Sequence, residues 1–204
     1  MIVISGIIPI KVKLMKKMVV LISALAVLII AFSGCVGDNK PAVNGTDSET
    51  SGANAISDLN LSEINVPANF SYDVTLPLAT NEIKSNYKAE SVSGILEGSE
   101  GCYNDSNKTD YYIDVIKLED KEATNNFITT YKSSFPPLNN NASRFMDESF
   151  NGHSAVKITN YITYGGKTIP RYSYIWNNGN YVIVVYGNTA DDSLVKRLAE
   201  ATGY

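Results

Sequence analysis

The sequence predicts an α+β domain in which an antiparallel sheet carries two helices on one face, in the order β-β-α-β-β-β-β-α. The strongest observation is a series of three dipeptides that tolerate the positive φ angles of two-residue hairpin turns. These dipeptides are Asn151-Gly152, Gly165-Gly166 and Asn178-Gly179. The segments between them are rich in β-branched and aromatic residues, which favour strands. We therefore predict a four-stranded antiparallel meander. Its strands are expected over residues 144–150, 153–164, 167–176 and 180–187.

Two further strands are predicted ahead of this meander. Residues 86–97 indicate a first strand that is broken by Gly94, and the glycines within residues 98–101 indicate a turn. Residues 111–118 are apolar on both faces apart from Asp114 and one lysine. That pattern is typical of a central strand, buried on both sides.

Two helices complete the predicted domain. Asp120 is a suitable N-cap for a helix that runs to about Ser134, where a pair of prolines ends it. Thr189 followed by Asp192 resembles a capping box and predicts the start of the last helix. Both helices have an apolar stripe at helical spacing. The stripes consist of Ala123, Phe127 and Tyr131 in the first helix and Leu194, Val195, Leu198 and Ala201 in the second.

In element order and size, the predicted domain is similar to the PsbP-like domains of small secreted lipoproteins. The resemblance is architectural, because no local motif specifies a member of that family. It implies a binding or assembly role, which is what this fold class mainly hosts.

The N-terminal segment has the organisation of a signal peptide. Lys16 and Lys17 precede an uncharged apolar run over residues 18–32, which is followed by Ser33-Gly34-Cys35. This arrangement resembles a lipobox, in which the cysteine thiol receives a lipid and becomes the first mature residue. The match departs at Phe32, where bacterial lipoboxes prefer leucine.

The run Gly34-Cys35-Val36-Gly37, with the polar tract after it, is similar to lipoproteins of archaeal methanogens. We predict a signal peptide or membrane anchor over residues 1–34, a flexible tether over residues 35–55 and an extracytoplasmic domain over residues 56–204. Translation is expected to start at Met15, because the apolar residues ahead of it do not fit a signal peptide.

Two alternatives to lipidation remain open at this point. Residues 18–36 are nearly long enough to span a bilayer, which takes about 20 residues, so the segment could be an uncleaved anchor. In both cases the lysines stay in the cytoplasm and the domain lies outside. The other alternative is a disulfide between Cys35 and Cys102, the two cysteines of the chain.

The charge distribution argues against nucleic acid as a partner. Four of the 17 Lys and Arg residues precede Cys35 and none of the 21 Asp and Glu residues does, so the part after Cys35 has a net charge of −8. An acidic surface repels phosphate backbones. An exterior location agrees with several N-glycosylation sequons after Cys35. They begin at Asn44, Asn60, Asn69, Asn104, Asn107 and Asn141.

No residue pattern in the sequence indicates a catalytic or metal site. His153 is the sole histidine, and its neighbour Ser154 should point to the opposite face of the strand. One histidine and one remaining cysteine are too few for a zinc site. A polar loop could offer oxygen ligands to calcium but lacks the EF-hand spacing, so a solvated turn is the simpler interpretation. Its polar residues are Asn104, Asp105, Asn107 and Asp110. No cofactor is expected.

Two-residue turns also fix which residues of the meander face each other. The expected pairs are Ile162 with Ile169, Ile158 with Ser173, Val156 with Ile175, Ile175 with Val182, and Ser173 with Val184. These side chains form a mainly aliphatic face, which we assign to the two helices.

The opposite face of the meander is aromatic and charged, which is typical of a surface that meets a partner. The candidate binding face consists of Tyr161, Tyr172, Tyr174, Trp176, Tyr181 and Lys157, near Arg144 and Glu148. In the alternative interpretation, residues 56–97 fold over this face and make it a second core layer.

The expected function is that of a non-catalytic binding or assembly module, anchored by lipid to the outer face of the cell membrane, with a protein or glycan partner. A hydrolase with an unrecognised pair of acidic residues and a purely structural envelope component are the alternatives. An enzyme would show converging polar groups in a pocket, and a binding module an exposed aromatic or apolar patch.

Overall fold

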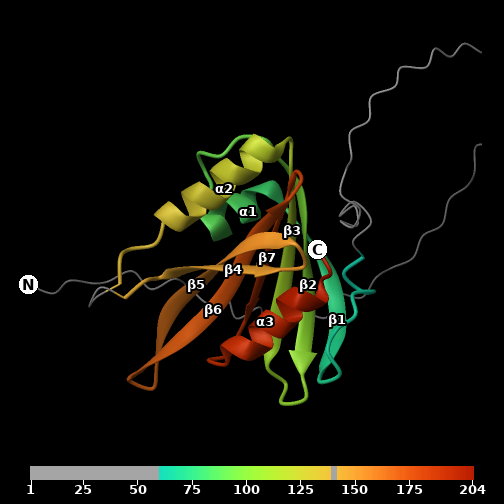
Figure 1. The fold of residues 1–204 in the computed structure, drawn as a ribbon, viewed down its shortest axis with the longest axis vertical. Coiled ribbons are helices and arrows are strands. Elements are labelled where there is room, and N and C mark those ends of the chain that lie inside the picture. Colours follow the sequence, from blue (N-terminus) through green and yellow to red (C-terminus); the bar gives the residue numbers. More distant parts are fainter. Residues whose placement is uncertain (1–59, 139–141) are drawn as a thin grey trace, which may run out of the picture. The chain divides into compact units, whose positions relative to one another are not determined.

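The computed structural model describes residues 60–138 and 142–204, which form an α+β domain with an open antiparallel sheet of seven strands and three helices (Figure 1). The strand order in the sheet is β1-β2-β3-β7-β6-β5-β4. The strands are β1 (Phe70–Leu78), β2 (Ile95–Asp105), β3 (Asp110–Leu118), β4 (Phe145–Phe150), β5 (His153–Tyr164), β6 (Lys167–Asn178) and β7 (Tyr181–Gly187). The helices are α1 (Thr80–Tyr87), α2 (Lys121–Ser133) and α3 (Asp192–Ala201). The predicted signal segment over residues 1–34 and the whole predicted tether over residues 35–55 lie outside the described residues.

The predicted meander is confirmed as β4 to β7, and the first two turns have the expected conformation. Asn151 and Gly152 have φ angles of 52° and 79°, the left-handed conformation that this turn requires. The pairs predicted across Gly165-Gly166 are all present.

The third turn lies one residue later than predicted. Asn178 pairs with Tyr181, so Gly179 and Asn180 form the turn. The partner of Ile175 is consequently Val184 and not Val182. Moving the turn by one residue changes each pairing partner by two residues. Every side chain therefore stays on its predicted face, because side chains alternate between faces with a period of two.

The predictions ahead of residue 105 were partly wrong. β1 and α1 were missed, and the expected strand over residues 86–97 is the end of α1, a loop and the beginning of β2. β1 is an edge strand with mostly exposed side chains, and α1 buries only Ile83 and Tyr87, so neither shows a strong apolar pattern.

The glycines of residues 98–101 lie within β2 and do not form a turn. A β-carbon at Gly98 would lie 2.8 Å from Cδ1 of Ile83 in α1, and one at Gly101 would lie 3.0 Å from the ring of Tyr103. These glycines are therefore explained by the close approach of side chains to the strand, including one from α1.

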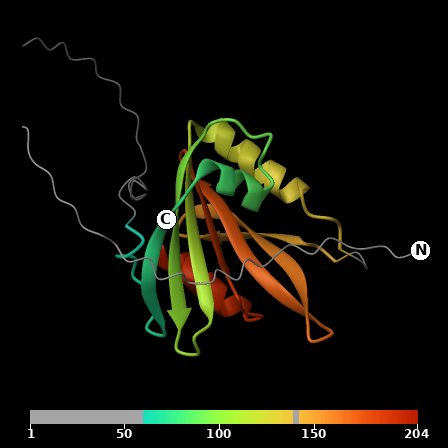
Figure 2. The same cartoon turned by 180° about the vertical axis from the view of Figure 1, so that it is seen from behind.

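The expectation that both helices cover one face of the sheet was wrong. On β7, Val182 and Val184 pack into a core with Phe127 of α2, whereas Ile183 and Val185 pack into a second core with Leu198 of α3. Neighbouring residues of a strand point to opposite faces, so α1 and α2 cover one face and α3 covers the other. Figure 1 shows α3 in front of the strands, and Figure 2, the view from behind, shows α1 and α2 on the near side. We name these the α1/α2 face and the α3 face.

The start of α2 is confirmed and that of α3 is corrected. Asp120 caps α2, with its Oδ1 accepting a hydrogen bond of 2.8 Å from the backbone N–H of Ala123. The cap of α3 is Asp191, which accepts from the N–H of Ser193, while the Thr189 hydroxyl oxygen accepts from the N–H of Asp191 ahead of the helix. A carboxylate at this position also interacts favourably with the helix dipole.

Candidate functional site

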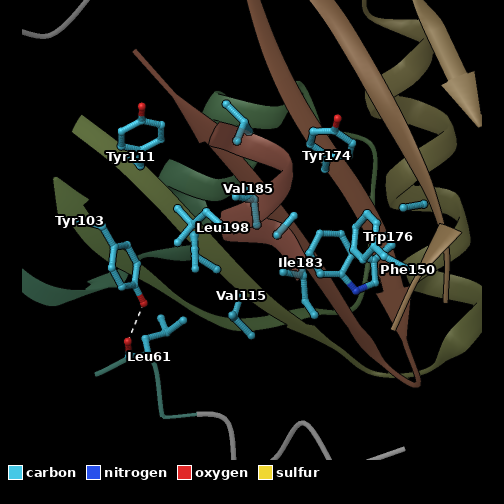
Figure 3. Close-up of a cluster of buried hydrophobic side chains, with 14 of the residues drawn as sticks. Leu61, Tyr103, Tyr111, Val115, Phe150, Tyr174, Trp176, Ile183, Val185 and Leu198 are labelled. Carbon is cyan, nitrogen blue, oxygen red and sulfur yellow. Dashed lines mark hydrogen bonds between the residues drawn. The ribbon is translucent and has the colours of Figure 1, made fainter. Parts of the chain in front are cut away.

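The centre of the predicted aromatic binding face is part of the core. Tyr174 and Trp176 are both buried beneath α3, and Figure 3 shows Trp176 beside Phe150, with Ile183 and Leu198 nearby. The rings of Trp176 and Phe150 meet edge to face, with their centroids 5.0 Å apart. This placement agrees with the alternative in which the face is a second core layer.

The cover over this face differs from the one expected. It consists of α3 together with a short segment that contains Leu61, and not of residues 56–97 as a whole. The hydroxyl of Tyr103 in β2 donates a hydrogen bond of 2.5 Å to the backbone oxygen of Leu61, which fastens that segment to the sheet (Figure 3).

The polar groups of the same face hold α3 in place. Asp192, in the first turn of α3, accepts hydrogen bonds from the Tyr174 hydroxyl at 2.8 Å and from the Lys157 ammonium at 2.9 Å. Lys196 pairs with Glu148 at 2.9 Å. Charged residues that were expected at a partner surface therefore bind the protein's own helix.

The remaining members of the predicted face lie at its borders. Tyr172 and Tyr181 are half-buried and pack against the α3 core. The guanidinium of Arg144 donates to the backbone oxygens of Pro136 and Thr159 near the β4 edge. Tyr161 is the one member of the six-residue candidate face that is exposed.

Tyr161 belongs to a part of the β5–β6 hairpin that projects beyond its neighbours. β4 pairs with β5 only as far as Ile158, and β7 pairs with β6 only from Ser173. Residues 160–171 pair with each other alone, and we name them the arm. Figures 1 and 2 both show this hairpin, in orange, extending away from the strands beside it.

The arm exposes apolar side chains on both of its faces. Tyr161 is 46% exposed and Tyr164 is 75% exposed, while Ile162 pairs with Ile169, each of them half-buried. An isolated two-stranded hairpin is marginally stable in water, so a projecting arm with large apolar side chains is typical of a contact element.

The other face of the sheet contains a buried carboxyl group at its centre. Asp114 of β3 is 1% exposed, and its Oδ2 accepts a hydrogen bond of 2.5 Å from the Tyr87 hydroxyl at the end of α1. No described residue hydrogen-bonds to its Oδ1. Burial raises the pKa of Asp114 to about 8, with a smaller contribution from the nearby Glu100, and the Tyr87 hydrogen bond opposes this rise. Asp114 is therefore protonated at neutral pH.

Glu100 lies directly opposite Asp114 on β2 and is half-buried. It accepts a hydrogen bond of 3.1 Å from the Tyr186 hydroxyl, and the Tyr186 ring stacks on Tyr112 with 5.0 Å between centroids. Burial, and after it the charges of Asp114 and Glu100, raise the pKa of Tyr186, which keeps its proton. The sequence indicated this site only through Asp114, the one carboxylate within the mainly apolar residues 111–118.

Cys102 is next to this group, in surroundings that disfavour its thiolate form. Within residues 60–138 and 142–204 its thiol forms no disulfide, and it lies 3.8 Å from Oε1 of Glu100, to which it donates a weak hydrogen bond. Burial, followed by the charge of Glu100, raises the pKa of Cys102 to about 11. The thiolate is the nucleophilic form, so a thiol of this pKa is a poor nucleophile at neutral pH.

The loop considered for calcium is organised by its own backbone. Oδ1 of Asp105 accepts hydrogen bonds from the N–H groups of Asn107 at 2.8 Å and Thr109 at 2.9 Å. These bonds lower the pKa of Asp105. Across residues 60–138 and 142–204, no three His, Cys, Asp or Glu side chains are grouped so that they could hold a metal ion.

The other expected positions are distributed over the surface. His153 is half-buried just after the first hairpin turn. Among the sequons, Asn60 and Asn107 are exposed and Asn69 and Asn104 are half-buried. Asn44, Asn141 and the lipidation candidate Cys35 lie outside the described residues. A surface depression lined by Ser91, Val92, Ser93, Asn126, Thr129 and Thr130 contains no titratable side chain.

Comparisons of the chain with models of protein families, with curated proteins and with solved structures found no match. None of the described helices is long and apolar enough to cross a membrane.

Proposed function

We propose that the protein is a lipoprotein on the outer face of a membrane and acts there as a non-catalytic binding or assembly module, with the arm as its contact element. The observation that carries this proposal is the projection of residues 160–171 beyond both neighbouring strands, with exposed Tyr161 and Tyr164. The rest of the predicted binding face packs under or beside α3, so Tyr161 in the arm is the member of that face that remains open.

The arm is suited to contact because its side chains contribute little to the fold of the domain. Tyr161, Tyr164 and the isoleucine pair lie outside the two buried cores. Covering apolar surface on a partner contributes roughly 25 cal/mol per Å² before the costs of association. Aromatic residues are enriched at the centres of such interfaces.

The double change Tyr161→Thr and Tyr164→Thr tests this role. We expect the melting temperature to stay nearly unchanged, because exposed substitutions usually alter stability by less than about 0.5 kcal/mol. Chemical cross-linking of the full chain in its native membrane should give fewer products with partners. The matched control is Leu96→Thr, since Leu96 is 50% exposed but lies at the start of β2. Equal cross-linking of all three proteins would refute the assignment.

Lipid attachment is proposed at Cys35, and Cys35→Ser tests it. A two-chain lipid holds a protein stably at a membrane, so the variant should remain an unprocessed precursor or release the domain after cleavage by another peptidase. Metabolic labelling with a radioactive lipid precursor measures the attachment directly. Lipid incorporation at the wild-type level in the variant would contradict this assignment.

A second candidate function, hydrolysis, is favoured by one observation. Asp114 and Glu100 are cross-strand neighbours, and a buried carboxyl group of raised pKa beside a second carboxyl group is a combination that acid–base catalysis uses. Turnover of a panel of nitrophenyl esters and glycosides would support this function only if both Asp114→Asn and Glu100→Gln abolished it. Turnover unchanged in both variants would exclude these residues.

A further inference from the structure

We propose that the arm docks on an anionic lipid bilayer surface. This inference rests on the proposed function and names the partner of the same contact element. It is carried by the order of side chains along one face of the arm and by the distribution of charge around it.

One face of the arm combines apolar side chains with cations on both sides of them. The cross-strand pairs on this face are Asn160 with Arg171, Ile162 with Ile169, and Tyr164 with Lys167. The two isoleucines therefore lie between Arg171 and Lys167, and Tyr164 lies beside the Gly165-Gly166 turn at the tip. Aliphatic side chains bordered by tyrosine, lysine and arginine match the composition of a membrane interface, where lysine and arginine extend their charges toward the headgroups.

The charge of this region differs in sign from the charge of the chain after Cys35. The sequence contains no Asp or Glu between Glu148 and Asp191, and this stretch includes the whole arm. Lys157, near the base of the hairpin, is neutralised by Asp192, whereas neither Lys167 nor Arg171 takes part in an ion pair within the described residues. An anionic surface therefore attracts the arm and repels the acidic remainder of the domain, which orients the domain with the arm toward the lipid.

A weak interaction between the arm and the bilayer is enough to populate the docked state. Each lysine or arginine near an anionic leaflet contributes about 1 kcal/mol, which corresponds to about a five-fold change in the equilibrium constant for docking. The proposed anchor keeps the domain close to the bilayer, so docking of the arm is an intramolecular step at high effective concentration.

A tryptophan at the tip reports docking directly. Tyr164→Trp places the indole where 75% of the tyrosine is exposed, and the native Trp176 is buried in the α3 core, out of reach of a lipid-borne quencher. The full chain with this change is reconstituted through its own N-terminal segment into vesicles of brominated phosphatidylcholine, with or without brominated phosphatidylglycerol. The control variant, Ser91→Trp, adds the indole at an exposed position in the depression beside α2.

In vesicles that contain phosphatidylglycerol, we expect the added emission of Tyr164→Trp to shift to the blue and to be mostly quenched, and that of Ser91→Trp to stay unquenched. Adding Lys167→Gln or Arg171→Gln should weaken docking about five-fold each, and high salt should reduce it. Blue-shifted emission from the buried Trp176 in every variant shows that the domain is folded.

Unquenched emission of Tyr164→Trp in anionic vesicles would overturn the membrane assignment. If the arm-dependent cross-linking in native membranes persisted in that case, the proposed contact role of the arm would stand with a protein or glycan partner. If that cross-linking were also absent, both proposals would fall. Equal quenching of Tyr164→Trp and Ser91→Trp would likewise overturn the inference, because docking would then not be specific to the arm.

Discussion

Truncating Tyr174 to alanine is expected to lower the free energy of unfolding by about 3–5 kcal/mol, as the loss of a large buried aromatic side chain does. Tyr174 is fully buried between the sheet and α3, and its hydroxyl donates to Asp192 in the first turn of that helix. Tyr174→Ala thus opens a cavity and removes one of the contacts that hold α3. Denaturant unfolding followed by far-ultraviolet circular dichroism measures the change.

Two control variants separate the contributions. Tyr174→Phe removes the hydrogen bond alone and should cost about 1–2 kcal/mol. Tyr161→Ala changes an exposed tyrosine on the same face of the sheet and should cost less than about 0.5 kcal/mol. Similar costs for Tyr174→Ala and Tyr161→Ala would show that α3 does not cover this face.

The stability of the domain is expected to fall as the pH rises through the pKa of Asp114. The folded state raises the pKa of Asp114 from 3.8 to about 8, so the folded protein holds this proton more tightly than the unfolded chain does. The stability that depends on this proton is fully present below about pH 4 and is lost as the pH rises toward 8. Between pH 5 and pH 8 the linked loss amounts to at most about 4 kcal/mol.

Asp114→Asn isolates this effect from that of other titrating groups. The amide does not titrate, so the variant does not lose this part of its stability as the pH rises. The free energy of unfolding of the wild type, relative to that of the variant, should therefore fall between pH 5 and pH 8. Asp105 and Asp191 have lowered pKa values and act in the opposite sense, but they are present in both proteins and cancel in the comparison. Parallel stability curves for the two proteins would show that Asp114 is ionised throughout this range.

Part of the fold was predictable because local turn chemistry determines it. The turns at Asn151-Gly152 and Gly165-Gly166 fixed strand pairing without reference to distant residues, and Asp120 marked the start of α2. At the third turn, the sequence around Gly179 allows two positions for a two-residue loop, and strand alternation kept the side chains on the predicted faces in either case.

The parts that were missed depend on contacts between segments far apart in the chain. Gly98 leaves room for the side chain of Ile83 from α1. In the sequence alone, where α1 was not predicted, this glycine resembles a turn signal. The position of α3 could not be derived from its apolar stripe, because both faces of the meander are apolar enough to receive a helix.

The candidate contact element was not predicted from the sequence and follows from the strand lengths in the structure. β5 and β6 have 12 residues each, whereas β4 has 6 and β7 has 7, so the longer hairpin must project from the sheet. The composition of the aromatic face does not separate its buried members from its exposed ones. That separation depends on where α3 ends, which is a property of the folded domain.

Hydrogen–deuterium exchange on the full chain tests directly whether the arm is the contact element. A hairpin without further support opens often, so the amides of residues 160–171 should exchange rapidly when the chain is in detergent. In native membranes we predict that these amides become protected while those of the β2–β3 loop around Lys108 do not. Rapid exchange of the arm in both settings would show that the arm is not the contact element.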